Sequence, residues 1–178
     1  MCIRDSVNPN KNIILVGPMG SGKTTVGRKL SERLKKDFYD SDHEIINRTG
    51  VSIDHIFEIE GESGFRERET EILKNLCSMQ NIIIATGGGV VLSLENRDLM
   101  KVSAMVIYLS SSIEQILRRT SKSKTRPLLE RSKDRRKTIS DIIEAREEFY
   151  QDVASVTINT NGKKLTEVIE EIVNNIGI

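Results

Sequence analysis

A glycine-rich segment near the amino terminus, Gly17–Thr24, has the residue types and spacing of a phosphate-binding loop. It matches the pattern G-x-x-x-x-G-K-[ST] at every fixed position. Glycines let the backbone curl so that consecutive N–H groups point at phosphate oxygens. Lys23 is expected to open a helix and to reach the β- and γ-phosphates, while the hydroxyl of Thr24 would ligate Mg²⁺. The predicted nucleotide contacts here are Gly20, Ser21, Gly22, Lys23, Thr24 and Thr25.

Two carboxylates, Asp40 and Asp42, follow the next short apolar segment. Ligands of parallel α/β sheets lie beyond the carboxyl ends of strands, so one carboxylate could serve a metal ion and the other a substrate hydroxyl. Aspartate is also a favoured capping residue. A turn, or a helix N-cap formed by Asp42, is therefore an equal alternative.

Three glycines and two arginines are further candidates for binding an anionic substrate. Gly87–Gly89 could form a flexible turn, but their place at the end of an apolar segment favours close backbone approach to a ligand. Arg66 and Arg146 each lie in a helical pattern, where an arginine is usually a surface charge. Their functional interpretation is a bidentate grip on a carboxylate, although spacing alone does not pair them.

The elements that must position these residues alternate between short apolar runs and amphipathic stretches, which is typical of a β-α-β protein with a parallel sheet. Strands are expected at Ile13–Val16, Phe38–Asp40, Ile82–Ala85, Ala104–Leu109 and Val156–Asn159. Helices are expected at about 23–35 and 62–77, from a capping box at Ser112 to about 119, and over an apolar stripe at 165–176.

One basic segment, at about 121–137, stands apart because it has few apolar residues. Its composition fits two alternatives about equally well. One is a solvated charged loop, and the other is a lid that closes over phosphates. The basic residues of this segment are Lys122, Lys124, Arg126, Arg131, Lys133, Arg135, Arg136 and Lys137.

Length and composition restrict the class of protein. The 178 residues suit one domain, expected at 12–178, with 1–11 as a non-native or disordered extension. Lys plus Arg (27) nearly balance Asp plus Glu (26), so charge gives no argument for nucleic acid or membrane partners. The two cysteines form no disulfide framework, and no apolar run is long enough to cross a bilayer. A cytoplasmic monomer that acts on small molecules is expected.

Together these motifs resemble the shikimate kinase family. The resemblance extends from about Asn12 to the carboxyl terminus, in the family's order and spacing. It rests on Gly17–Thr25, Phe38–Asp42, Gly64–Glu69, Ala85–Gly89, Arg126–Leu129 and Arg146–Tyr150. The phosphate loop is shared by many families, whereas the other elements together are far more specific. The resemblance implies a three-layer α/β/α fold like that of nucleoside monophosphate kinases, with a five-stranded parallel sheet and a mobile lid.

The resemblance also implies an activity, the ATP-dependent phosphorylation of the 3-hydroxyl of shikimate on the way to chorismate and the aromatic amino acids. Asp42 would hold the substrate hydroxyls, first as a positioner and second as a proton acceptor. Arg66 and Arg146 would hold the substrate carboxylate. Gly88, with Gly89 beside it, would contact the substrate through the backbone.

On the nucleotide side, the resemblance implies that Arg126 in the lid touches the ATP phosphates and shares in catalysis with Lys23 and Asp42. Asp40 would support Mg²⁺ through water, beside Thr24, which stands where many relatives have serine. Arg119 and Lys163 would lie near the adenine, on a looser match to the family pattern.

Three alternatives remain at this stage. A gluconate kinase would also need arginines for a carboxylate, although the joint presence of the motifs favours shikimate. A nucleoside monophosphate kinase would need more aromatic partners than four Phe, three Tyr and no Trp provide. A nucleotide-dependent switch without an acceptor would not need the acceptor-site candidates.

Overall fold

The structure is a computed structural model that describes residues 8, 10–121, 129 and 132–177. Its centre is a sheet of five parallel strands in the order β2-β3-β1-β4-β5. The strands are β1 Asn12–Val16, β2 Asp37–Asp40, β3 Ile82–Ala85, β4 Ala104–Ser110 and β5 Val156–Asn159. Each lies within a residue or two of its expected range, so the predicted parallel sheet is confirmed.

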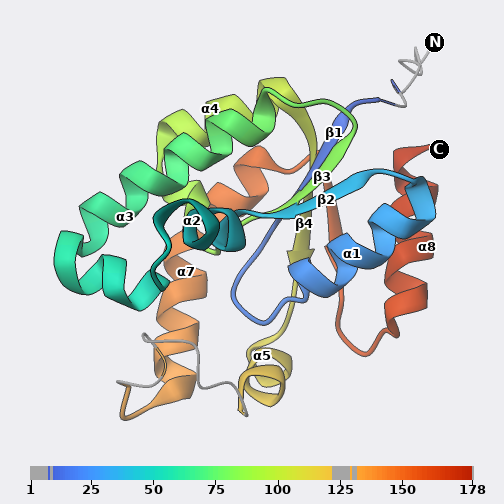
Figure 1. Ribbon diagram of the computed structural model, residues 1–178. Helices are drawn as coiled ribbons and strands as arrows, with labels where there is room; N and C mark the ends of the chain where they lie inside the picture. The colour runs from blue at the N-terminus through green and yellow to red at the C-terminus, as the bar shows by residue number, and fades with distance from the viewer. Residues whose placement is uncertain (1–7, 9, 122–128, 130–131, 178) are drawn as a thin grey trace.

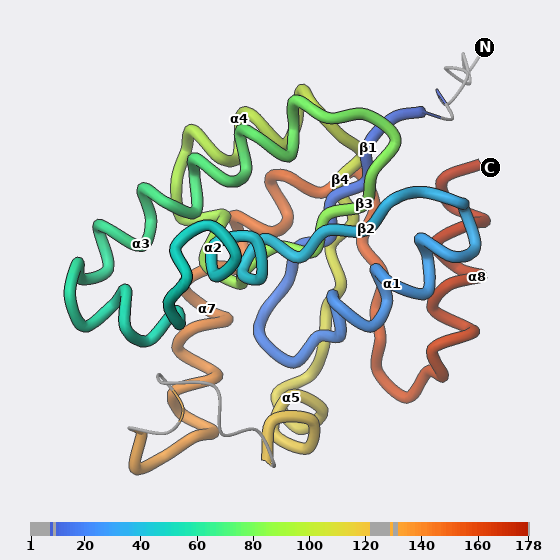
Figure 2. Tube along the Cα trace, viewed as in Figure 1, coloured from blue at the N-terminus to red at the C-terminus, as the bar shows by residue number. Residues whose placement is uncertain are grey.

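The helices cover both faces of this sheet, which gives the predicted three layers (Figure 1). The helices are α1 Lys23–Leu34, α2 Ser41–Thr49, α3 Ile53–Cys77, α4 Leu94–Ser103, α5 Ile113–Thr120, α7 Arg135–Val153 and α8 Leu165–Ile176, with a short 3₁₀ turn η1 at Val90–Leu92. The tube in Figure 2 follows α1 and α8 on one side of the strands and α3, α4 and α7 on the other.

The alternation of side chains along β1 explains the two cores. Ile13 and Leu15 pack with α1 and α8, and Ile14 and Val16 pack with α3, α4 and α7. Successive side chains of a strand point to opposite faces, so a strand covered on both sides must be apolar throughout. All five residues of β1 are buried, and four of them, Ile13–Val16, form a continuous apolar run.

Strand order fixes where a ligand can bind. β2 and β3 lie on one side of β1 and β4 and β5 on the other, so the chain changes direction at β1. Loops that leave neighbouring parallel strands on opposite sides of such a switch point open a crevice at the carboxyl ends. In Figure 1 these ends point down, toward α5.

One helix differs from its expected extent, and α4 and α7 had no expected range. The helix expected at 62–77 is the second half of α3, which begins at Ile53 and is interrupted by Gly61 at φ 70° and ψ −174°. The first half was not predicted, although Ile53, Ile56 and Phe57 have helical spacing, and Gly61 separates it from the second half. The helix α7 begins at Arg135, so it includes the last residues of the segment expected as a lid.

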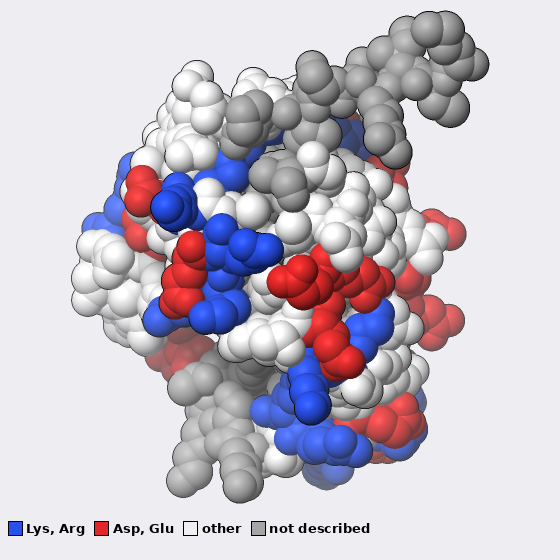
Figure 3. Space-filling model, turned by 90° about the vertical axis from the view of Figure 1, so that its right-hand side faces the viewer, with Lys and Arg blue, Asp and Glu red and all other residues white. Residues whose placement is uncertain are grey.

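Over the residues that the structure describes, no helix combines the length and apolarity needed to span a membrane. The face in Figure 3 carries acidic and basic side chains intermixed, and basic ones gather at its lower end, where α5 lies in Figure 1. Any functional excess of positive charge is therefore local, as the balanced composition predicts.

Candidate active site

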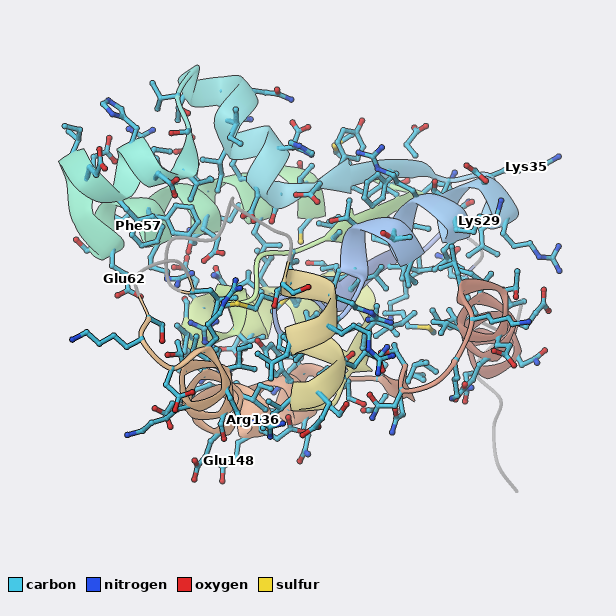
Figure 4. The ribbon with its side chains drawn as sticks, turned by 90° about the horizontal axis from the view of Figure 1, so that it is seen from below. Lys29, Lys35, Phe57, Glu62, Arg136 and Glu148 are labelled. Atoms are coloured by element: carbon cyan, nitrogen blue, oxygen red, sulfur yellow. The ribbon has the colours of Figure 1, made fainter. Side chains whose placement is uncertain are left out.

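A cleft of about 730 Å³ opens at the carboxyl ends of the strands. Seen from below in Figure 4, α3, which carries Phe57 and Glu62, lies above α7, which carries Arg136 and Glu148. The cleft wall combines the phosphate loop with the two aspartates, the glycine turn and both candidate arginines. Within the described part of the chain, every predicted site residue lines this one cleft: Gly20, Ser21, Gly22, Lys23, Thr24, Thr25, Asp40, Asp42, Arg66, Gly88, Gly89, Arg119, Arg146 and Lys163.

The phosphate loop connects β1 to α1. Gly17 has φ 150°, and a β-carbon there would lie 2.5 Å from the carbonyl oxygen of Leu109, so only glycine fits. Gly22 is the N-cap of α1 and provides no side-chain cap, which leaves the first N–H groups of the helix to an anion. The Lys23 ammonium donates hydrogen bonds to the carbonyl oxygens of Gly17 (2.7 Å) and Pro18 (2.9 Å), inside the loop.

Asp40 divides its two carboxylate oxygens between two helices. Oδ1 accepts hydrogen bonds from the backbone N–H groups of Asp42 (3.1 Å) and His43 (3.3 Å), and Oδ2 accepts one from the Thr24 hydroxyl (2.7 Å). The alternative that Asp42 caps the following helix is therefore wrong, because Asp40 is the N-cap of α2. The cap fixes the first turn of α2, and that turn carries Asp42 into the cleft.

Asp42 has an acceptor atom that no group of the described residues uses. Its Oδ1 is buried without a hydrogen-bond partner, and a β-carbon on Gly87 would lie 3.1 Å from it. Burial raises the pKa of this carboxyl, and the charge of Asp40 acts in the same direction, while Lys23 and Arg66 lower it. A carboxylate held this way can accept a hydrogen bond from a substrate hydroxyl.

Arg66 is paired with Glu69, a residue to which sequence analysis assigned no role. The two side chains form an ion pair of 2.8 Å one helical turn apart on α3, and Glu69 is 1% exposed. A β-carbon on Gly89 would collide with the Arg66 guanidinium, so the glycine turn packs directly against it. The signal was present in the sequence, because residues at i and i+3 of a helix are neighbours.

Burial raises the pKa of Glu69 from 4.5 to about 7, although the charge of Arg66 and its hydrogen bond oppose the shift. Within the described part of the chain, Glu69 Oε1 is a second buried acceptor without a partner, and a β-carbon on Gly87 would lie 2.9 Å from it. The free oxygens of Asp42 and Glu69 thus approach the same glycine. A ligand with neighbouring hydroxyls fits this arrangement.

Arg146 enters the cleft from α7, on the other side of the glycine turn. A β-carbon on Gly88 would lie 3.5 Å from Arg146 Nη1 and equally far from the backbone nitrogen of Met19 in the phosphate loop. The arginine and the phosphate loop therefore both approach Gly88 closely. Tyr150, which sequence analysis also left without a role, donates a hydrogen bond from its hydroxyl to the Gly88 carbonyl oxygen (2.6 Å).

Arg119 and Lys163 lie at the α5 and α8 end of the cleft. Arg119 donates a hydrogen bond to the Gly20 carbonyl oxygen (3.1 Å), and burial lowers its pKa. Lys163 forms an ion pair with Glu171. The capping box at Ser112 is only half formed, because the Gln115 side chain donates to the Thr160 carbonyl oxygen (3.1 Å) and so joins α5 to the loop before Lys163.

Arg126 and most of the expected lid at 121–137 lie outside the described residues. The contact of Arg126 with the ATP phosphates therefore stays a prediction. At the described ends of this segment, Arg135 donates a hydrogen bond to the Thr120 carbonyl oxygen (3.2 Å).

Glu69 leads to a prediction about stability. Its folded-state pKa of about 7 is above the usual 4.5, so between these pH values the folded chain holds a proton that the unfolded chain has lost. The free energy of unfolding should therefore fall as pH rises from 5 to 8, by up to about 3 kcal/mol from this group. Glu69→Gln should lose that slope, measured by denaturant unfolding at both pH values.

Glu67→Gln is the matched control, because Glu67 is an exposed glutamate on the same helix. The control should keep the pH slope of the unmodified protein. A slope that is unchanged in Glu69→Gln would show that the carboxyl of Glu69 titrates as it does in water.

Known proteins that are similar to this chain are shikimate kinases. A family model described as shikimate kinase matches residues 19–177. The chain is 44% identical over 163 residues to a shikimate kinase of Haemophilus influenzae, covering 92% of this chain and 91% of that protein. It is 55% identical over 153 residues to a shikimate kinase of Nitrosospira multiformis, covering 86% and 77%.

Solved structures give the same result. The fold matches a shikimate kinase from Acinetobacter baumannii in complex with shikimate, with a TM-score of 0.90 and 44% identity over 93% of this chain and 92% of that one. A gluconokinase from Sinorhizobium meliloti matches with a TM-score of 0.57 and 18% identity, over 94% and 91% of the two chains. The second likeness is one of fold alone.

Proposed function

This chain belongs to the shikimate kinase family, and from that premise we propose which of its residues carry the transfer of a phosphoryl group from ATP to the 3-hydroxyl of shikimate. One observation carries the assignment: the phosphate loop and the group Asp42, Arg66 and Arg146 line one cleft. ATP and shikimate bound in the same cleft can be aligned for in-line transfer of the phosphoryl group. Substrates bound at two separate sites could not react directly.

The donor half consists of the phosphate loop and the start of α1. The N–H groups of the loop and the helix dipole would bind the ATP phosphates, and Lys23 would offset their charge from within the loop. Arg119 and Lys163 would border the adenine at the other end of the cleft. Arg126 would add positive charge to the phosphates, as the family resemblance implies.

The acceptor half consists of Asp42, the two arginines and the glycine turn. Arg66 and Arg146 approach Gly89 and Gly88 from different helices, which supports a two-sided grip on the shikimate carboxylate. The free Oδ1 of Asp42 would accept a hydrogen bond from the attacking hydroxyl. Phosphoryl transfer depends mainly on alignment and charge, so Asp42 acts as a positioner before it acts as a base.

The donor set around Thr24 and Asp40 fits Mg²⁺. A hydroxyl and a carboxylate oxygen lie 2.7 Å apart beside the phosphate loop, and both are hard oxygen ligands. Over the residues that the structure describes, no group of three or more His, Cys, Asp or Glu could hold a metal ion. The few protein ligands suit an ion held chiefly by substrate phosphates and water. The ion would offset the charge of the β- and γ-phosphates.

A prediction follows for Asp40. Asparagine is as good a helix cap as aspartate but carries no charge, so Asp40→Asn should keep α2 while weakening the metal site. We expect the Mg²⁺ concentration for half-maximal activity to rise about tenfold. The measurement is a Mg²⁺ titration at fixed ATP. An unchanged titration curve would remove Asp40 from the metal site.

The assignment is tested by a coupled assay with ATP, Mg²⁺ and a panel of acceptors. Shikimate should be phosphorylated, and gluconate and nucleoside monophosphates should react far more slowly. ATP hydrolysis without acceptor should be slow as well. Preference for another acceptor, or hydrolysis independent of acceptor, would overturn the assignment of Arg66 and Arg146 to a shikimate carboxylate.

We further propose that residues 12–178 form one domain that acts as a monomer in the cytoplasm. The sheet and both cores join β1 to α8, which supports a single domain. One chain brings proposed groups for both substrates to the same cleft, which is compatible with a monomer. Light scattering coupled to gel filtration would test the monomer, and cell fractionation would test the location.

A further inference from the structure

Tyr150 joins two parts of the acceptor half that are far apart in sequence. Its side chain is fully buried, with a relative exposure of 0%, and its hydroxyl donates to the Gly88 carbonyl oxygen at 2.6 Å. The bond connects α7 to the glycine turn after β3, 62 residues away. Since Gly88 lines the cleft, a change in this bond changes the wall against which a ligand packs.

Arg146, one helical turn earlier on α7, reaches the same glycine, since a β-carbon on Gly88 would lie 3.5 Å from Arg146 Nη1. Burial raises the pKa of Tyr150 to about 12, and the nearby charge and hydrogen bond of Arg146 oppose the rise. The phenol therefore stays protonated at neutral pH and donates a hydrogen bond to the Gly88 carbonyl oxygen. Its oxygen remains free to accept from the guanidinium, because a tyrosine hydroxyl both donates and accepts.

A second tyrosine holds the ring of Tyr150 in place. The rings of Tyr108 on β4 and Tyr150 stack with centroids 5.0 Å apart and an interplanar angle of 21°. The Tyr108 hydroxyl donates to Glu147 at 2.6 Å, away from the cleft lining, and Gln151 donates to the same carboxylate at 2.8 Å. The position of Tyr150 is thus set by a central strand and by its own helix.

We propose that Tyr150 is a positioning residue for shikimate, which orients the Arg146 guanidinium and fixes the Gly88 backbone in one arrangement. The inference deepens the proposed function and rests on it, because it assumes that Arg146 and Gly88 meet the shikimate carboxylate. A bidentate grip needs the guanidinium held in one plane and at one distance. The hydrogen bond of Tyr150 goes to Gly88 and its ring stacks on Tyr108, and neither residue is among the groups proposed to bind ATP.

The test compares Tyr150→Phe with Tyr108→Phe. Each change removes one hydroxyl from the same stacked pair and keeps both rings. In Tyr150→Phe the Gly88 carbonyl loses its donor, and the KM for shikimate should rise about tenfold, with kcat and the KM for ATP within about twofold. In Tyr108→Phe all three constants should stay within about twofold of the unmodified enzyme.

A structural role alone would give a different result. Equal changes in the KM values for shikimate and ATP, the same change in both variants, or no change in Tyr150→Phe would each overturn the proposal. Calorimetric titration with shikimate gives a second measurement that does not depend on turnover. It should show about tenfold weaker binding for Tyr150→Phe only.

A double-mutant cycle tests the link to Arg146. Once Arg146→Lys has removed the planar guanidinium, adding Tyr150→Phe should raise the shikimate KM by clearly less than the tenfold seen alone. Full additivity of the two changes would overturn the link. If the unmodified enzyme did not phosphorylate shikimate, the proposed function itself would fail, so the two failures are distinguishable.

Discussion

Asp42→Ala is expected to lower kcat for shikimate phosphorylation by about 10³- to 10⁴-fold, with a smaller effect on the KM for ATP. Asp42 contributes a buried carboxylate oxygen that has no hydrogen-bond partner among the described residues. This oxygen lies close to the glycine turn and in the same cleft as the phosphate loop. Without it, the attacking hydroxyl loses the group that aligns it with the γ-phosphorus. Steady-state kinetics with varied shikimate and ATP measure both constants.

Asp42→Asn separates alignment from proton transfer. An amide oxygen can still accept the hydroxyl's hydrogen bond, but it cannot take the proton. If alignment dominates, the asparagine variant should keep about tenfold or more activity over the alanine variant. Equal losses in the two variants would show that Asp42 is needed as a base. Asp37→Asn, at the exposed opposite end of β2, is the control and should behave as the unmodified enzyme.

Arg66→Ala is expected to weaken shikimate binding by about 100-fold and to leave nucleotide affinity nearly unchanged. The Arg66 side chain is 23% exposed, and its pairing with the buried Glu69 holds the guanidinium against Gly89. A positive charge in a partly buried site attracts a carboxylate ligand more strongly than a fully exposed charge does, because the effective dielectric constant is lower there. Calorimetric titrations with shikimate and with a non-hydrolysable ATP analogue measure the two affinities separately.

Arg68→Ala provides the control for Arg66→Ala. Arg68 lies two residues further along α3 and pairs with Glu60, outside the residues that line the cleft. Its removal should change neither affinity. Equal losses of shikimate and nucleotide in Arg66→Ala would contradict a role confined to the acceptor. Thermal unfolding of both variants distinguishes a lost contact from a lost fold.

The phosphate loop and the sheet could be predicted from sequence because both are local patterns. Gly17–Thr24 encodes its own geometry, and a strand such as Ile13–Val16 that is covered on both faces has to be apolar. Spacing alone gave no reason to join Arg66 to Arg146. They were assigned through the family resemblance, and packing of α3 and α7 on the same side of the sheet brings both to the cleft.

What sequence analysis missed depends on contacts between distant segments or on choices between neighbours. Tyr150 reaches Gly88 across 62 residues, and no local pattern marks that pair. The choice of Asp40 over Asp42 as the cap of α2 depends on where β2 ends, to within one or two residues. Glu69 was overlooked for a simpler reason: an acidic residue one turn from an arginine usually forms a surface pair, and only burial gives it importance.

The carboxylate of Asp40 ties the first turn of α1 to the first turn of α2. The start of α1 belongs to the half of the cleft that would bind the phosphates of ATP. The start of α2 carries Asp42, which would align the attacking hydroxyl. Both helix starts are therefore held by the same side chain, that of Asp40. The distance that the phosphorus atom has to cross therefore depends on these short hydrogen bonds of Asp40.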